Sequence, residues 1–436
     1  MAELRAAYPR PHRSPRYKIA AGIVAGVVLA VLGGSLINLT VTGSGFALVD
    51  LAGLFIVGLI AAGTYLVILA VDREPHKRGR HLLRAGIVFA IALALFLFSA
   101  NLLYANLDIL GAIACIPTSA LALWVIRRVD YNEREPWRLI LVAFVWGAVG
   151  ATTLALVFES LWGRAIDIHL IPGPGQQVAT AFSAALLEEG PKGIAVLLLF
   201  LVMRDEFDDV VDGIVYGAAI GIGFNFMETI VYISVGGPAQ WFLRQVLGLF
   251  LGHPTYTALI GAGVGVARQL RNPGARLAAI AAGFLAAMAA HFAWDAWLWY
   301  FPRPSEPLLL LLSIPLQYLL MTGPFAGVVI ALLVLGLRVE GRALKEQLQV
   351  EAALPDGAVL PGEVPILISP TQRFLARWRL RGSRGWKGYG WARRLQRAQI
   401  DLAMERWHRA RQEIEEPLEA ELRLRDRVLA IRRSAP

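Results

Sequence analysis

The sequence predicts an all-α protein, a polytopic transmembrane helical bundle of about ten helices with a charged helical C-terminal tail. Two observations favour this fold class. The chain is 56% hydrophobic and only 17% charged, whereas about a quarter of the residues in a soluble protein are charged. The deficit is uneven, because residues 19–337 are mostly apolar and residues 338–436 are charged and rich in arginine. We therefore expect a membrane domain followed by a tail outside the membrane.

Apolar runs long enough for membrane-spanning helices, which need about 20 residues, define the predicted bundle. There are ten, at residues 19–39, 47–71, 83–104, 107–126, 138–162, 177–203, 212–234, 241–267, 277–300 and 307–337. The third and fourth runs meet in a tight turn near Ala105. The tenth contains Pro315 and Pro324, so we expect it either to kink or to begin as a short segment at the membrane surface. The first run is longer than the roughly 7–15 residues of a signal-peptide core, so we expect it to be retained.

Basic residues occur in alternate loops of this bundle. They gather before the first run and after the second, fourth, sixth, eighth and tenth runs, whereas the other loops carry few. Cytoplasmic loops of membrane proteins have this excess of Lys and Arg, so we expect a multi-pass protein with both termini in the cytoplasm. The same distribution accounts for the formal net charge of +9. The lipid bilayer is therefore an expected partner and nucleic acid is not.

These patterns divide the chain into a basic cytoplasmic N-terminus (1–18), a transmembrane domain (19–337) and a cytoplasmic linker and basic helical tail (338–436). Four prolines between residues 351 and 370 predict an extended linker. Charged residues with scattered leucines over 391–433 predict one or two exposed helices, broken near a proline.

Tryptophans lie among the many arginines of the tail, at positions 378, 386 and 391. This mixture suits contact with anionic lipid on the cytoplasmic leaflet. A cytoplasmic partner, or a solvated tail without a specific role, is the alternative.

Ionisable residues interrupt four consecutive predicted helices, the sixth to the ninth. Burying such a group in a membrane helix costs roughly 2.5–3.5 kcal/mol, so each one needs a structural or functional reason. The set comprises Glu188, Glu189 and Lys192 in the sixth helix, Glu228 in the seventh, His253 in the eighth, and His291 and Asp295 in the ninth.

Helical spacing predicts how some of these residues meet. Lys192 lies four residues after Glu188 and three after Glu189, so its ammonium can reach either carboxylate. Asp295 follows His291 by one turn and can orient an imidazole. A rise of about 1.5 Å per residue puts the glutamates and histidines about 9–18 Å from the outer ends of their helices. One common site toward the outer leaflet is therefore expected.

The small residues of the seventh helix also have a regular spacing. Gly213, Gly217 and Gly221 recur every four residues, which lets a neighbouring helix approach closely. We expect this stripe to bring Glu228 near the sixth helix.

Glutamates and histidines at one depth are suited to hydrolysis. Glu188 or Glu189 can take a proton from water. Glu228, His253 and His291 can hold Zn²⁺, which lowers the pKa of bound water to about 7. A metal-free scheme is the alternative, in which Glu and His activate the water and a second His stabilises the oxyanion. The HExxH zinc motif is absent, so metal ligands must come from separate helices.

The same motifs resemble the PrsW family of bacterial intramembrane proteases, which is related to the CAAX prenyl endopeptidase and Abi group. The resemblance covers roughly residues 140–335 and consists of Glu188-Glu189-Gly-Pro-Lys192, Phe224-Asn-Phe-Met-Glu228, His253 and His291-Phe-Ala-Trp-Asp295, in that order. It implies an intramembrane endopeptidase of the metalloprotease or glutamate type in the bacterial cell membrane. It also implies a membrane-anchored protein substrate, such as an anti-sigma factor cut at site 1 from the outer side. Thr229 and Asp295 stand where relatives often have asparagine.

Two other functions are compatible with buried carboxylates and histidines. A proton- or ion-coupled membrane transporter also keeps ionisable residues in its helices, but it predicts repeats in both halves of the chain. The ionisable residues here cluster in one half. A non-catalytic membrane scaffold of the same fold is the third hypothesis, and the intact set of ionisable residues argues against it.

Overall fold

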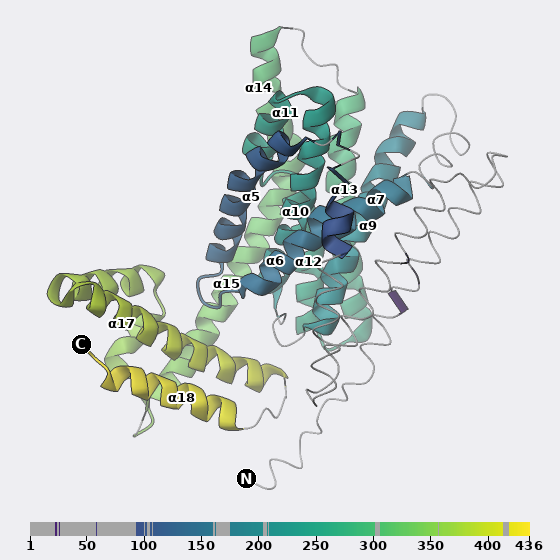
Figure 1. The fold of residues 1–436 in the computed structure, drawn as a ribbon. Helices are drawn as coiled ribbons and strands as arrows, with labels where there is room; N and C mark the ends of the chain where they lie inside the picture. Colours follow the sequence, from purple (N-terminus) through teal and green to yellow (C-terminus); the bar gives the residue numbers. More distant parts are fainter. Residues whose placement is uncertain are drawn as a thin grey trace. The chain divides into compact units, whose positions relative to one another are not determined.

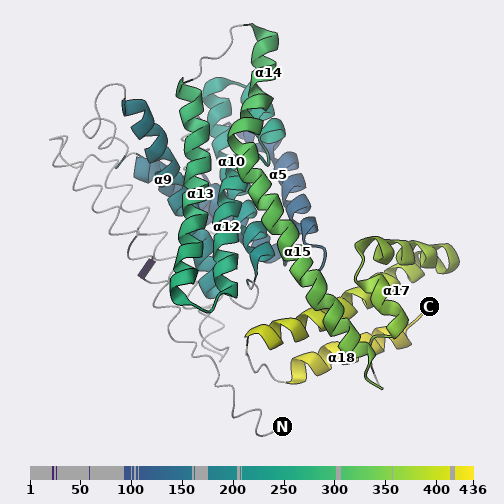
Figure 2. The same ribbon diagram turned by 180° about the vertical axis from the view of Figure 1, so that it is seen from behind.

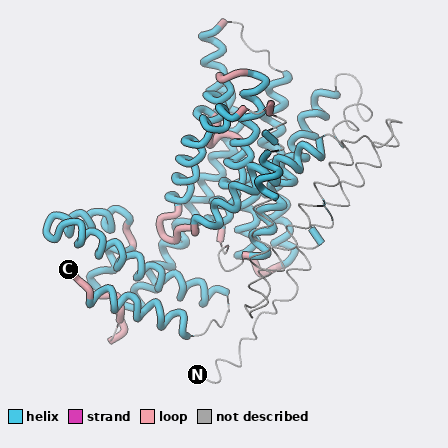
Figure 3. Tube along the Cα trace, viewed as in Figure 1, coloured by secondary structure: helices cyan, strands magenta, loops and turns pink. Residues whose placement is uncertain are grey.

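The computed structural model describes residues 93–99, 108–159, 175–203, 209–300, 306–355, 357–412 and 418–436, together with a few isolated positions. All regular secondary structure in these ranges is helical (Figure 3), which confirms the all-α prediction. The described residues form two compact units. The membrane unit contains residues up to 333 except 130–134, and the tail unit contains 130–134 and 334–436. The predicted runs 19–39 and 47–71, and most of 83–104, lie outside the described residues.

The helices of the membrane unit follow the predicted apolar runs closely. They are α5 (Ile109–Val129), α6 (Trp137–Val145), α7 (Thr152–Phe158), α9 (Gln176–Val202), α10 (Val210–Gly236), α12 (His253–Gln269), α13 (Pro273–Tyr300) and α14 (Pro307–Gln317). A π-helical segment, η1 (Trp146–Ala151), joins α6 to α7. The tight junction near Ala105 is a turn in which Asn106 has a φ of 52°.

Within the described ranges, five helical segments are long and apolar enough to cross a membrane. They are Ile109–Val129, Trp137–Phe158, Val210–Gly236, Pro273–Leu298 and Leu312–Ala352. Helix α9 is not among them because it carries three charged residues, and α12 has only 17 residues. These segments indicate a membrane protein, while the total of ten spans stays a prediction.

Helix α10 lies at the centre of the membrane unit and packs against α5, α6 and α12 (Figures 1 and 2). It begins with a reciprocal cap, in which the Asp209 side chain accepts from the Val211 amide and Asp212 accepts from the Asp209 amide. Its apolar residues surround the whole helix, as expected for a helix buried on all sides.

The glycine stripe of α10 makes the predicted close helix contact, but its partner is α12 and not the expected sixth helix, α9. A Cβ added at Gly217 would lie 2.4 Å from the Thr257 carbonyl oxygen, and one at Gly221 would lie 2.3 Å from the His253 carbonyl oxygen. Across the same contact, a Cβ at Gly261 would lie 1.8 Å from the Gly213 carbonyl oxygen. Because backbone atoms fill this space, only glycine fits at these positions.

The predicted continuous helix over 241–267 is wrong in its first half. The chain forms α11 (Ala239–Phe242) and the π-helical η4 (Leu243–Leu247), loses helical structure over 248–252, and starts α12 at His253. Pro254 explains the break, because proline has no amide to donate to the carbonyl four residues earlier. The Thr255 hydroxyl donates instead to the Phe250 carbonyl over 2.5 Å.

A π-helical segment interrupts the tenth predicted run. Helix α14 passes through η5 (Tyr318–Thr322) into α15 (Gly323–Ala352). Helix α15 extends well beyond the predicted end at residue 337.

The tail unit is folded rather than extended. Beyond α15 it contains η6 (Pro361–Glu363), α16 (Val364–Leu367), α17 (Pro370–Gln412) and α18 (Leu418–Arg433). The predicted linker over 351–370 is therefore a compact turn with two short helical segments. The predicted exposed helices also bury apolar side chains, including Leu395 and Leu402 against Val428.

Candidate functional site

Lys192 lies at the centre of the site and is completely buried. Its ammonium donates to the Glu188 carboxylate over 3.1 Å and to the Glu189 carboxylate over 2.9 Å, as the helical spacing predicts. It also donates to Nδ1 of His253 over 2.9 Å. Lys192 therefore links two carboxylates of α9 to the first residue of α12.

Phe224 covers the same ammonium from α10. The Lys192 nitrogen lies 3.5 Å from the centre of the Phe224 ring, a cation–π contact that favours the charged amine in an apolar setting. The same ring packs against the His253 imidazole at a centroid distance of 4.8 Å. Phe224 thus holds Lys192 of α9 and His253 of α12 in place.

The proton position on His253 follows from its two contacts. Because Nδ1 accepts from Lys192, the proton lies on Nε2, which donates to the Glu228 carboxylate over 2.5 Å. The same carboxylate pairs with the Arg244 guanidinium over 2.7 Å. Arg244 also lies 3.6 Å from the centre of the Tyr232 ring. Glu228 is consequently held between a histidine and an arginine.

His291 of α13 contacts the other side of the glutamate pair. Its Nδ1 lies 3.0 Å from the Glu189 carboxylate, so a proton on Nδ1 donates to Glu189. Its Nε2 then faces Glu188 at 3.8 Å and Asp295 at 3.5 Å. Asp295 thus lies beside His291 as the spacing predicts, while Glu189 binds the nitrogen that fixes the tautomer.

A cavity of about 840 Å³ opens beside these residues. Its wall includes Glu188, Glu228, His253, His291 and Asp295. This volume lies within the range of roughly 300–1,000 Å³ that small ligands occupy in proteins. These five side chains come from α9, α10, α12 and α13, so the fold brings together the residues that the sequence placed at one depth.

Glu189 and Lys192 lie behind the cavity wall, and both are 0% exposed. Among the described residues, Glu189 Oε2 is a buried oxygen without a hydrogen-bond partner. Such an atom is costly in an apolar setting, and it leaves the carboxylate able to accept another donor.

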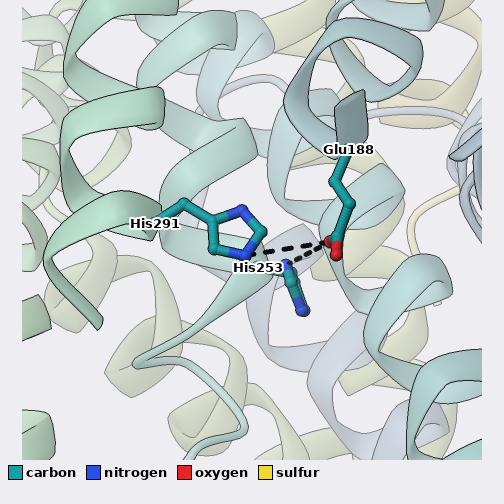
Figure 4. A group of neighbouring side chains, drawn as sticks. All are labelled: Glu188, His253 and His291. Carbon is teal, nitrogen blue, oxygen red and sulfur yellow. Dashed lines mark ion pairs between the residues drawn. The ribbon is translucent and has the colours of Figure 1, made fainter. Parts of the chain in front are cut away.

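The donor set fits a zinc ion. Ligand atoms of Glu188, His253 and His291 lie within 4.8 Å of one another (Figure 4). Two histidines and one carboxylate are a common set for catalytic zinc. The sequence placed Glu228 in this set. In the structure Glu188 joins the two histidines, while Glu228 contacts the far nitrogen of His253.

The His253 nitrogen that faces this set, Nδ1, accepts the Lys192 hydrogen bond. A bound ion would take the place of that bond. The Lys192 ammonium thus supplies positive charge beside Glu188 and Glu189. A bound metal ion would supply positive charge at the same place.

Residues 135–334 match the family model described as PrsW family intramembrane metalloprotease. Residues 135–334 are thus similar to the PrsW family. Protease PrsW of Geobacillus kaustophilus is 32% identical over 133 residues, which are 30% of this chain and 55% of that relative. Protease PrsW of Bacillus subtilis is 30% identical over 139 residues, which are 32% of this chain and 60% of that relative.

The chain thus spans little more than half the length of these two PrsW relatives. No solved structure matches it. The apolar helices and the bacterial relatives indicate a bacterial membrane protein.

The cavity also has wall residues that the sequence patterns did not single out: Glu159, Arg244 and Tyr256. The Tyr256 ring stacks on His291 at a centroid distance of 5.2 Å and an angle of 20°. The rule that identified the glutamates, a charge within an apolar run, also applies to Arg244. Tyr256 lies three residues after His253 on α12 and therefore on the same face of the helix. This spacing indicates that Tyr256 lines the cavity beside His253.

Proposed function

We propose that the chain is an intramembrane endopeptidase that hydrolyses a peptide bond of a membrane-anchored protein in the cavity of its PrsW-family segment. One observation carries the proposal: two histidines and the carboxylates of α9 and α10 meet at the wall of a cavity of about 840 Å³. This arrangement offers water-activating and charge-stabilising groups at one place. Neither the transporter nor the scaffold hypothesis calls for this convergence.

In the metal-free scheme, we assign Glu188 as the base that takes the proton of the attacking water. It lines the cavity, and Lys192 neutralises it from behind. Glu189 is buried and instead orients His291 by accepting from its Nδ1.

The opposite nitrogen of His291 lies at the cavity and can exchange a proton with the reacting groups. His253 accepts from Lys192 at Nδ1 and donates to Glu228 from Nε2, so it fixes both groups at the cavity wall. Asp295 and Lys192 act through the residues that they contact.

Zn²⁺ is a fitting cofactor for this site. Glu188, His253 and His291 would hold it, and the ion would polarise the peptide carbonyl and lower the pKa of bound water. The metal-free scheme uses the same side chains, with Glu188 as base.

The remaining expectations extend this proposal to the cell. We infer a multi-pass protein of the bacterial cell membrane with both termini in the cytoplasm, because the basic loops favour that orientation. The site then faces the outer leaflet, which suits site-1 cleavage of an anchored regulator such as an anti-sigma factor. For the tail, anionic lipid and a cytoplasmic protein are the two candidate partners.

The proposed activity is tested by comparing cells that express the full chain with cells that express its Glu188→Gln or His291→Ala variant. Shed fragments of single-pass membrane proteins are identified by mass spectrometry of new N-termini. We expect at least one protein to be cut near its membrane segment by the full chain, and to stay intact with either variant.

Glu306→Gln is the matched control for this experiment, because Glu306 is exposed at the start of α14. It should cleave like the unaltered chain. Cleavage that persists in both site variants would overturn the proposal.

A further inference from the structure

The first part of α17 is a dense run of positive charge. Residues 370–400 contain nine Arg and Lys residues and no Asp or Glu. Elsewhere in the tail residues of both signs occur together, as in the Arg406–Glu351 ion pair. A run of one sign is self-repelling, so its presence in a folded segment calls for a partner of opposite charge.

Helix α17 folds back on itself within this run. The Arg377 side chain donates to the Gln396 side chain over 2.6 Å. In a straight helix, residues nineteen apart would be about 28 Å from each other. The chain reverses at Gly385, whose φ of 64° and ψ of −162° are accessible to glycine. The result is a helical hairpin with Gly385 at its tip (Figure 1).

Aromatic side chains gather at this hairpin tip and are not covered by the described residues. The Trp378 and Trp386 rings lie 6.4 Å apart, and Tyr389 lies 5.8 Å from Trp386. Trp386 is 66% exposed and Trp378 is 40% exposed. Exposed clusters of large apolar side chains indicate an interaction surface.

Arginine and tryptophan are interleaved at the tip. The Arg381 guanidinium lies 4.3 Å from the Trp378 ring centre and 4.1 Å from the Trp386 ring centre. The Arg384 guanidinium donates to the backbone oxygen of Pro436 over 2.8 Å. Tryptophan prefers the interface between water and lipid, and Lys and Arg side chains are attracted to an anionic lipid surface.

The hairpin is also tethered to a membrane-spanning segment. Helix α15 ends at Ala352 and α17 begins at Pro370. The connection of roughly 17 residues spans at most about 60 Å even when fully extended. This covalent connection keeps the hairpin at a high local concentration near a lipid surface, whereas a soluble partner must diffuse to it.

We propose that the hairpin tip around Trp378, Arg381 and Trp386 docks on an anionic lipid surface. The tryptophan rings enter the interface and the arginines bind lipid phosphates. The inference rests on the proposed cytoplasmic position of the tail, and it is independent of the proposed protease activity.

The test uses the full chain in lipid nanodiscs made of phosphatidylcholine, with or without phosphatidylglycerol. Cys115 is the single cysteine of the chain, so Cys115→Ser combined with Ser383→Cys puts one spin label on the exposed tip. We expect the label to become accessible to membrane-dissolved oxygen and protected from a water-soluble nickel complex only when phosphatidylglycerol is present. Added Trp378→Ser and Trp386→Ser changes should abolish that difference.

A label at Leu422→Cys, exposed on α18, is the matched control and should not respond to lipid composition. A tip label that stays in water in both nanodiscs overturns the proposal and points to a protein partner. Immersion in both nanodiscs also overturns it, because anionic lipid would then not be required. Cleavage activity does not enter any of these readouts, so failure of the proposed function leaves the result interpretable.

Discussion

At the scale of single residues, Lys192 determines the charge balance of the site. Its three hydrogen bonds go to Glu188, Glu189 and His253, and it is completely buried. A buried ion pair contributes little net stability compared with apolar residues, but removing one partner leaves the other charge uncompensated. The two glutamates tolerate their membrane position because this ammonium lies between them.

Replacing Lys192 by Met is therefore expected to lower the free energy of unfolding by about 3–5 kcal/mol. Denaturant unfolding of the full chain in detergent measures the effect. Lys345→Met is the control, because Lys345 is exposed in α15, and it should change stability by less than about 0.5 kcal/mol. Equal unfolding midpoints for the two variants would contradict this role of Lys192.

Metal content tests the donor set independently of activity. We expect the purified full chain to bind about one zinc ion, held by Glu188, His253 and His291. Elemental mass spectrometry should find the ion lost in His253→Ala and His291→Ala and retained in Glu306→Gln. A chain that never binds zinc would leave the metal-free scheme as the working mechanism.

Arg244 and Glu228 are expected to act as a coupled pair. Their ion pair of 2.7 Å lies at the cavity, and Glu228 also accepts from His253. A double-mutant cycle with Arg244→Ala and Glu228→Ala should give a coupling energy of about 0.5–3 kcal/mol in unfolding experiments. Additive effects of the two changes would show that the pair has no energetic significance.

The identities of the site residues could be predicted from the sequence, because charge inside an apolar run is rare. Their partners could not. Whether Glu188 or Glu228 joins the histidines depends on the rotation of α9 and α10 about their axes. Helix α10 is buried on all sides, so its apolar pattern has no face from which that rotation can be inferred.

At the scale of elements, the contact between α10 and α12 positions the site. Gly221 packs against the His253 backbone, and Glu228 lies two turns further along the same helix. The glycine spacing predicts the close contact, but the expected neighbour was the sixth helix, α9, whereas the stripe packs on α12. The apolar neighbours of the Gly-His-Pro sequence at 252–254 predict a continuous helix. In the structure this sequence ends the non-helical segment before α12.

Gly217→Ala is expected to destabilise the protein by about 1–3 kcal/mol, because the new methyl group would overlap the Thr257 carbonyl. Gly190→Ala in α9 is the matched control, since no atom lies within 4 Å of its added Cβ. It should leave stability unchanged or raise it by about 1 kcal/mol. Thermal unfolding of both variants in the same detergent compares them, and equal losses would contradict the close contact.

At the scale of the whole molecule, the membrane unit and the tail unit have separate cores. The tail unit buries Leu344 and Leu348 of α15 with Ile400 and Met404 of α17. Sequence composition indicated the boundary between the units but not the tail core, because charged residues outnumber the leucines that form it. A pattern spread over a hairpin and two further helices is not visible in any single window of sequence.

Leu402→Ala is expected to destabilise the tail unit by about 2–5 kcal/mol, because the side chain is 1% exposed and leaves a cavity. Hydrogen exchange followed by mass spectrometry should show faster exchange in α17 and α18 and no change in α10 and α12. Faster exchange in α10 would mean that the two units unfold together.

The backbone packing of α10 on α12 also limits how the membrane unit can move. With carbonyl oxygens seated over Gly213, Gly217 and Gly221, a slide of even one residue along the helix axis would drive side chains into main chain. The two helices can therefore travel only as one rigid body, and the register between Glu228 and His253 is preserved through any motion. The proposed polypeptide substrate would therefore have to enter the cavity by displacement of other helices around this pair.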